Sequence, residues 1–152
     1  EALSEQKKKQ QSPGEDDKSI LYNDLDTESS DIDKEYEINK QVFQKLDSLI
    51  RRDELYLSAD LSREDLVRMA HMNNTRFAKM IKENTGTNLS GYINELRLNH
   101  AIHLLKEHPE YTLRAIAEAS GINSMPTFHS LFKNKTGMTP SEFKKTQMDM
   151  KQ

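Results

Sequence analysis

One pattern of residues occurs twice in the second half of the sequence, 51 residues apart. Its first copy, Phe77, Lys82, Thr85, Gly86 and Ser90, is matched in the second copy by Phe128, Lys133, Thr136, Gly137 and Ser141. A short apolar segment precedes each copy, at 66–70 and at 116–120, and there the offset is 50. The second copy therefore has one extra residue between its two predicted helices, where a turn tolerates insertion and a helix face does not. Each copy predicts a helix-turn-helix unit that ends at Thr-Gly.

Charge is divided unevenly along the 152 residues. Residues 1–39 hold 5 Lys and 12 Asp or Glu, a net charge of −7, and residues 40–152 hold 17 Lys or Arg and 13 acids, a net charge of +4. Few apolar residues interrupt the polar run at 1–34, which predicts a flexible acidic linker. A mildly basic body behind an acidic arm suits a domain that binds a polyanion.

Several kinds of chemistry are disfavoured by the residue content. The chain has no Cys, which excludes disulfides, thiolate zinc sites and thiol nucleophiles. His100 and His103 are three residues apart, but two imidazoles without a Cys or a nearby carboxylate make a poor metal site. No catalytic triad order, carboxylate pair or Gly-rich phosphate loop is present. We therefore predict no enzyme activity and no cofactor, metal or small-molecule site in this fragment.

No apolar run approaches the roughly 18 residues that a membrane-spanning helix needs. This predicts a cytoplasmic location. Tethering to the inner membrane, through another part of a longer protein, is the alternative.

Helical periodicity and capping signals predict an all-α fold: two helix-turn-helix units joined by a long connecting helix, preceded by one extra helix and the flexible arm. Ser62 and Asp65 have capping-box spacing, and Asn73, Thr112 and Ser124 are expected helix N-caps. The predicted segments are a leading helix and packed loop (35–60) and a double helix-turn-helix domain (61–147), which divides into unit one (62–88), a connector helix (90–107), unit two (112–137) and a final helix (140–147).

The order of residues from 61 to 145 resembles the C-terminal DNA-binding domain of the AraC/XylS family of bacterial transcription regulators. The residues that carry the resemblance are Tyr92-Ile93-Asn94-Glu95-Leu96-Arg97, Ala101, Leu104-Leu105, Ile116-Ala117, Gly121, Phe128, Phe132-Lys133 and Thr136 to Phe143. The segment 43–61 resembles the helix that precedes this domain in Bacteroidetes-type members, in which a sensor comes first. The resemblance implies that the chain is the output end of a larger sensor.

The resemblance further implies sequence-specific binding of double-stranded DNA, with the second helix of each unit in adjacent major grooves. The implied base contacts are Asn74, Thr75 and Lys79 in unit one, and Met125, Thr127, His129 and Ser130 in unit two. The implied phosphate contacts are Arg76, Lys82, Lys133 and Lys135. Ser130 stands where the family frequently has arginine, and serine has no bidentate fork for guanine, which predicts weak base reading by unit two.

Three alternatives remain open from the sequence. Arg97 is expected to pair with an acid such as Glu118, with a phosphate contact as the other reading. The neutral patch of Met125, Pro126, Thr127 and Ser130 also suits a protein-interaction module that docks a partner such as RNA polymerase. The apolar stripe of the leading helix either packs within one domain or pairs two copies into a homodimer.

Overall fold

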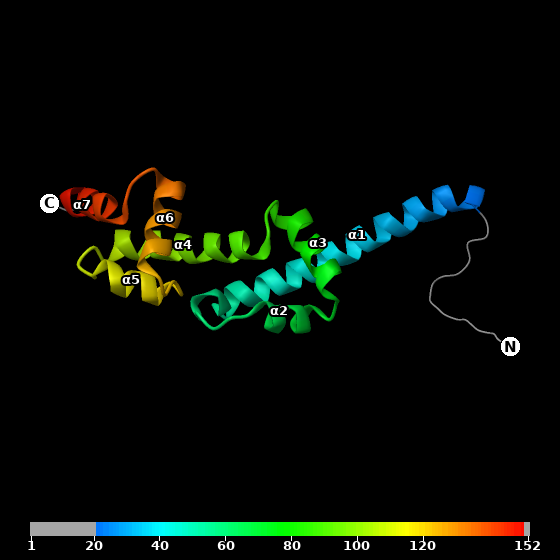
Figure 1. The fold of residues 1–152 in the computed structure, drawn as a ribbon, viewed down its shortest axis with the longest axis horizontal. Coiled ribbons are helices and arrows are strands. Elements are labelled where there is room, and N and C mark those ends of the chain that lie inside the picture. The colour runs from blue at the N-terminus through cyan, green and yellow to red at the C-terminus, as the bar shows by residue number, and fades with distance from the viewer. Residues whose placement is uncertain (1–20, 151–152) are drawn as a thin grey trace. The chain divides into compact units, whose positions relative to one another are not determined.

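The computed structural model describes residues 21–150, with side chains from residue 30 onward. Within this range every regular element is a helix, which confirms the prediction of an all-α fold (Figure 1). The elements in chain order are α1 (Leu21–Arg52), the 3₁₀ turn η2 (Leu55–Leu57), α2 (Arg63–Ala70), α3 (Asn74–Thr85), α4 (Leu89–Glu107), α5 (Leu113–Ala119), α6 (Met125–Thr136) and α7 (Pro140–Met150). The last helix thus continues three residues beyond its predicted end.

The chain divides into two compact units, residues 1–39 and 40–152. Of the first unit, the structure describes the helical residues 21–39, where Ile32, Tyr36 and Ile38 are exposed. The structure thus gives helix over residues 21–34, where the sequence predicted a flexible linker, and residues 1–20 lie outside the described part. The physical reason is helix propagation: once a helix is nucleated, each further residue adds a hydrogen bond at little cost, even where it contributes no apolar face. Acidic residues near a helix N-terminus also interact favourably with the helix dipole.

In the second unit, residues 40–52 of α1 pack against the first helix-turn-helix. Leu46 and Ile50 are buried in its core, with Val42 and Phe43 packed beside them. The Phe43 ring lies 5.5 Å from the Tyr92 ring, centroid to centroid. This part of the predicted apolar stripe therefore packs within the domain.

The two helix-turn-helix units repeat each other down to single hydrogen bonds. The residue before α3, Asn73, accepts from the backbone N–H of Arg76 at 2.8 Å, and Ser124 before α6 accepts from Thr127 at 3.3 Å. Gly86 and Gly137 end the two helices with φ of 79° and 80°, the left-handed conformation in which glycine is favoured. The expected N-caps of the other predicted helices are also present: Ser62 in a capping box, and Thr112 before α5.

The connecting helix α4 is shared by two separate cores. Tyr92, Ile93 and Leu96 belong to the core of the first unit. Leu98, Ala101 and Leu105 belong to that of the second. At about 3.6 residues per turn these two sets lie on opposite sides of the helix. The predicted connector helix therefore packs into both units.

Arg97 joins α4 to the loop that precedes the double helix-turn-helix. Its Nε donates to the carbonyl oxygen of Tyr56 at 2.6 Å, and a terminal nitrogen donates to that of Ser58 at 2.8 Å. The predicted partner Glu118 is therefore wrong, although the structural role is right. An acid is the partner expected for arginine from sequence, whereas two carbonyls left without helical partners at a loop satisfy a guanidinium equally well. Burial lowers the pKa of this guanidinium.

Candidate nucleic-acid interface

The outer face of α3 carries the residues predicted to contact DNA from the first unit. Phe77, Met80 and Ile81 turn inward and are fully buried. Asn74, Thr75, Lys79 and Lys82 are exposed, and Arg76 is half-buried. The helix thus presents amide, hydroxyl and cationic groups on one side, which are the donors and acceptors that base edges and phosphates require.

A side chain that the sequence did not single out lies at the start of this face. Arg63, the first residue of α2, donates from Nε to Oδ1 of Asn74 at 3.3 Å and from a terminal nitrogen to the Asn74 carbonyl at 3.4 Å. Its guanidinium carbon lies 5.4 Å from the centre of the Phe77 ring. No sequence signal points to this contact, because the two residues are 11 positions apart on different helices.

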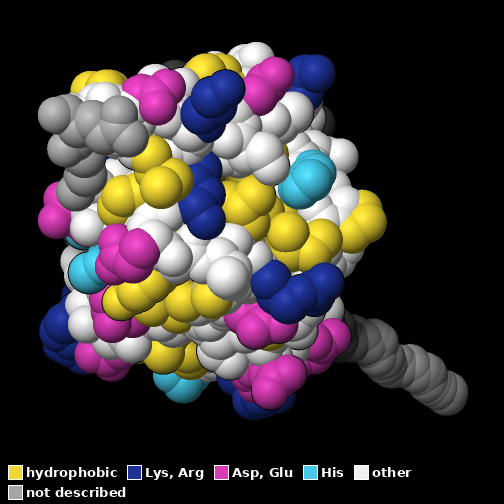
Figure 2. All heavy atoms as spheres, turned by 90° about the vertical axis from the view of Figure 1, so that its left-hand side faces the viewer, with side chains coloured by type: hydrophobic (Ala, Val, Ile, Leu, Met, Phe, Trp, Pro, Cys, Tyr) yellow, Lys and Arg dark blue, Asp and Glu magenta, His cyan; other side chains and the backbone are white. Residues whose placement is uncertain are grey.

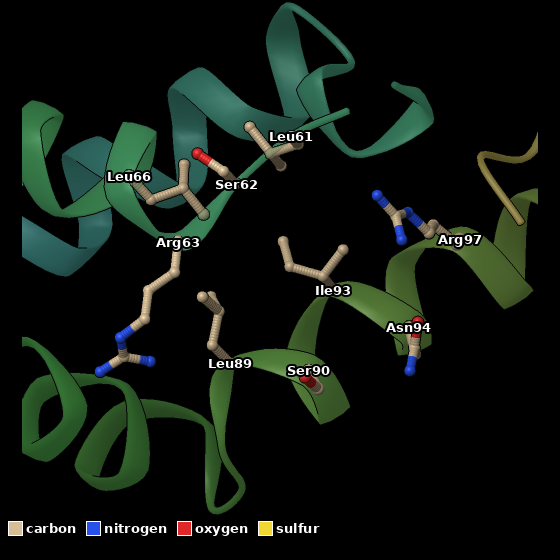
Figure 3. A pocket seen from close by; sticks show the side chains of 9 residues that line it. All are labelled: Leu61, Ser62, Arg63, Leu66, Leu89, Ser90, Ile93, Asn94 and Arg97. Atoms are coloured by element: carbon tan, nitrogen blue, oxygen red, sulfur yellow. The ribbon is translucent and has the colours of Figure 1, made fainter. Parts of the chain in front are cut away.

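Arg63 and Arg97 line the same pocket, and Figure 3 shows the directions in which their side chains extend. The pocket, of about 200 Å³, lies between α2 and the start of α4, and leucine and isoleucine side chains point into it. Arg63 leaves it toward α3, and Arg97 leaves it toward the loop after α1 (Figure 3). The two arginines therefore make different contacts, Arg63 with α3 and Arg97 with the loop after α1.

The outer face of α6 is less polar at its start. Thr127, His129 and Ser130 are exposed as predicted. Met125, also a predicted base contact, is half-buried and packs against the core of the second unit, so it is less exposed than the other three. A methionine in the first turn of a short helix gains more from filling a core gap than from solvent.

The basic residues of α6 stand in its last turn. Lys133 is exposed, in the position that Lys82 has on α3. Lys135 forms an ion pair with Glu95 of α4, and both side chains are partly exposed. A phosphate contact by Lys135 would have to compete with this pair, which the sequence did not predict because the partners are 40 residues apart.

Charge on the C-terminal end of the domain is mixed. Figure 2 looks onto the end where α5 and α7 lie, and the basic side chains there are separated by acidic and hydrophobic ones. The basic side chains therefore form no continuous surface on the face that Figure 2 shows.

The histidines considered as metal ligands lie in surroundings that do not resemble a metal site. His100 packs edge-on against the Tyr56 ring at 6.3 Å, and burial lowers its pKa. Among the residues whose side chains are described, no three His, Asp or Glu are grouped as a metal site would need. In the same part of the chain, every helix is too short or too polar to cross a membrane.

Comparisons with known proteins agree with this geometry. A family model described as a helix-turn-helix domain matches residues 66–146. The uncharacterised transcriptional regulatory protein YesN of Bacillus subtilis is 39% identical over 80 residues, which are 52% of this chain and 22% of that protein. The RCS-specific HTH-type transcriptional activator RclR of Escherichia coli is 31% identical over 81 residues, 53% of this chain and 28% of that protein. The chain thus spans less than a third of the length of these two relatives.

Solved structures show the same fold. A transcriptional regulator of Chromobacterium violaceum, described as containing an AraC-type DNA-binding domain, superposes with a TM-score of 0.61 at 27% identity, over 71% of this chain and 93% of that one. The C-terminal domain of the response regulator yesN from Fusobacterium nucleatum has a TM-score of 0.61 at 22% identity, over 68% of this chain and 98% of that one. The relatives named here are transcriptional regulators rather than enzymes. The chain therefore belongs to the helix-turn-helix domain family of the AraC type, a family of DNA-binding domains.

Proposed function

We propose that the domain reads two adjacent major grooves of one duplex, with α3 in the first groove and α6 in the next. The observation that supports this best is the pair of equivalently capped helices packed along one connecting helix (Figure 1). The 19 residues of α4 give a length of about 28 Å at about 1.5 Å per residue. Successive grooves on one face of B-DNA lie about 34 Å apart, so a modest bend of the duplex would bring both into reach.

In the first groove, Asn74, Thr75 and Lys79 are the proposed base readers. Asparagine suits adenine, the threonine methyl group suits the methyl group of thymine, and lysine suits guanine. Arg76 and Lys82 are the proposed phosphate contacts on the same helix.

In the second groove, Thr127, His129 and Ser130 offer single hydrogen bonds, and Lys133 and Lys135 offer phosphate contacts. None of these base-facing side chains has the fork of an arginine. We therefore propose that the first unit contributes most of the sequence preference and the second mainly adds affinity.

A second candidate function rests on the neutral character of the exposed start of α6. Pro126, Thr127 and Ser130 carry no charge and are exposed, which suits docking of a protein such as RNA polymerase. A homodimer through the leading helix would have to use Ile32, Tyr36 and Ile38, because the stripe from Val42 to Ile50 packs within the domain.

The test is selection of bound duplexes from a random library, followed by affinity measurements on the selected sequence. We expect two conserved blocks about one helical turn apart. Lys79→Ala should weaken binding about 5- to 150-fold and flatten the preference in one block, since a base contact contributes about 1–3 kcal/mol. The matched control is Lys106→Ala, which removes an exposed lysine from the C-terminal end of α4. This variant should keep the sequence preference in both blocks.

A salt titration separates the two candidate functions. Removal of one phosphate contact, by Lys82→Ala or by Lys133→Ala, should lower the slope of log affinity against log salt by about 0.9. A single conserved block would restrict the reading to the first unit. No enrichment, with binding insensitive to salt, would refute groove reading and favour the protein-docking function.

A further inference from the structure

Arg63 is held against the first turn of the recognition helix α3 by three contacts. Two are the hydrogen bonds to the side chain and the backbone carbonyl of Asn74, at 3.3 and 3.4 Å. The third is the face of the Phe77 ring, 5.4 Å from the guanidinium carbon. Phe77 is fully buried, so the surface on which the guanidinium rests is fixed by the core.

This arrangement determines which end of the Asn74 amide faces outward. A guanidinium has only donors, so the atom of Asn74 that meets Nε of Arg63 is the carbonyl oxygen. The amide nitrogen, Nδ2, is then on the other side of the group. An asparagine without such a neighbour can rotate its amide and present either a donor or an acceptor.

We infer that Arg63 is a positioning residue that makes Asn74 a hydrogen-bond donor toward DNA, so that the first unit selects against cytosine at the base that Asn74 meets. This rests on the proposed function, in which α3 enters a major groove. In the major groove, adenine presents the acceptor N7, guanine presents the acceptors N7 and O6, and thymine presents the acceptor O4. Cytosine presents only a donor, the N4 amino group. With adenine, the amide nitrogen Nδ2 of Asn74 still donates to N7.

The second unit replaces this polar pair by an apolar one. With the offsets of the sequence repeat, Arg63 corresponds to Leu113 and Asn74 corresponds to Met125. Leu113 and Met125 are both partly buried against the core of the second unit. The device therefore belongs to the first unit alone, and discrimination of this kind is expected in only one block of the binding site.

The experiment compares four duplexes that differ only in the base met by Asn74. That position is identified as the one at which the Asn74→Ala variant binds all four bases with equal affinity. Wild-type protein should bind the cytosine duplex about 5- to 150-fold more weakly than the best of the other three, the range for one base contact. Arg63→Met keeps the aliphatic stem over Phe77 but removes the donors, and it should reduce this ratio to within about 3-fold, which is below one good hydrogen bond.

Arg63→Lys separates positioning from charge. It keeps the positive charge but lacks the planar fork. We expect it to retain the salt slope of the wild type and to lose part of the discrimination against cytosine. Thermal melting of each variant verifies that it is folded, and an unchanged preference in the second block provides an internal control.

Two results would overturn the inference, and they differ from failure of the proposed function. The first is that Arg63→Met lowers affinity equally for all four duplexes, with the cytosine ratio unchanged and the salt slope reduced by about one, which would make Arg63 a phosphate contact only. The second is full discrimination in both Arg63 variants, which would likewise exclude a positioning role. Absence of any selected sequence for the wild type would instead refute the proposed function itself.

Discussion

At the scale of single residues, Gly121 has the tightest surroundings of the glycines in left-handed turns. Its φ is +84°, and a Cβ atom there would lie 2.7 Å from the carbonyl oxygen of Tyr56 and 2.9 Å from Nε of Arg97. Gly86 has a similar φ of +79° but nothing within 4 Å of its Cβ position. The first glycine is required for both conformation and space, and the second for conformation only.

This difference gives a prediction for the two Gly→Ala variants. Gly86→Ala should cost about 1–2 kcal/mol, the strain of a left-handed L-residue. Gly121→Ala should cost about 1–3 kcal/mol more, because the backbone of the loop after α1 must move. The measurement is the free energy of unfolding in urea, with Gly137→Ala, at φ +80° in open space, as a second reference. An equal loss of unfolding free energy at all three positions would show that the loop after α1 moves aside without destabilising the protein.

At the scale of elements, α3 and α6 end in the same threonine arrangement. Oγ1 of Thr85 donates to the Ile81 carbonyl at 2.7 Å and accepts from the N–H of Thr87 at 3.2 Å. Oγ1 of Thr136 donates to the Phe132 carbonyl at 2.9 Å and accepts from the N–H of Met138 at 3.1 Å. The hydroxyl satisfies an N–H just beyond the helix end, which explains why Thr-Gly recurs in the sequence.

We therefore expect Thr85→Val and Thr136→Val to destabilise the protein by similar amounts, about 1 kcal/mol each, since each leaves a partly buried N–H without its acceptor. Thr146→Val is the control, because that hydroxyl donates, at 3.0 Å, to the Glu142 carbonyl on an exposed part of α7. Urea unfolding of the three variants is the measurement. A large difference between the two repeat positions would mean that the units share sequence but not energetics.

At the scale of the whole domain, the leading helix is attached to the double helix-turn-helix through Tyr92. Its hydroxyl donates to the carboxylate of Asp47, which also pairs with Arg51 at 2.9 Å. Burial, and then the hydrogen bond to Asp47, raise the pKa of Tyr92 far above its ordinary value near 10. The folded state therefore keeps this proton to higher pH than the unfolded state does.

The sign of the resulting pH dependence follows from proton counts. The contribution of Tyr92 to stability is fully present below about pH 10 and is lost as the pH rises above it, because only the unfolded state releases the proton. We expect the free energy of unfolding to fall above about pH 10 in the wild type and to fall less steeply in Tyr92→Phe. Chemical unfolding at a series of pH values measures both. If the free energy of unfolding fell equally with pH in both proteins, Tyr92 would not contribute to the pH dependence of stability.

The sequence by itself determined the repeated units, their caps and their ends. These depend on local chemistry: a short polar side chain that accepts from the next turn, a glycine at a left-handed position, and apolar residues at helical spacing. That is why Asn73, Ser124, Gly86 and Gly137 were placed correctly.

Only the tertiary structure decided which distant groups meet. The carbonyls that receive Arg97, the pairing of Lys135 with Glu95, the contact of Arg63 with Asn74 and the burial of Met125 all join residues on different elements. The start of α1 at Leu21 was missed for a related reason, since a helix stabilised by packing at one end extends through residues that carry no periodic signal of their own. Local patterns specify elements, and the packing between elements specifies which of their polar groups become partners.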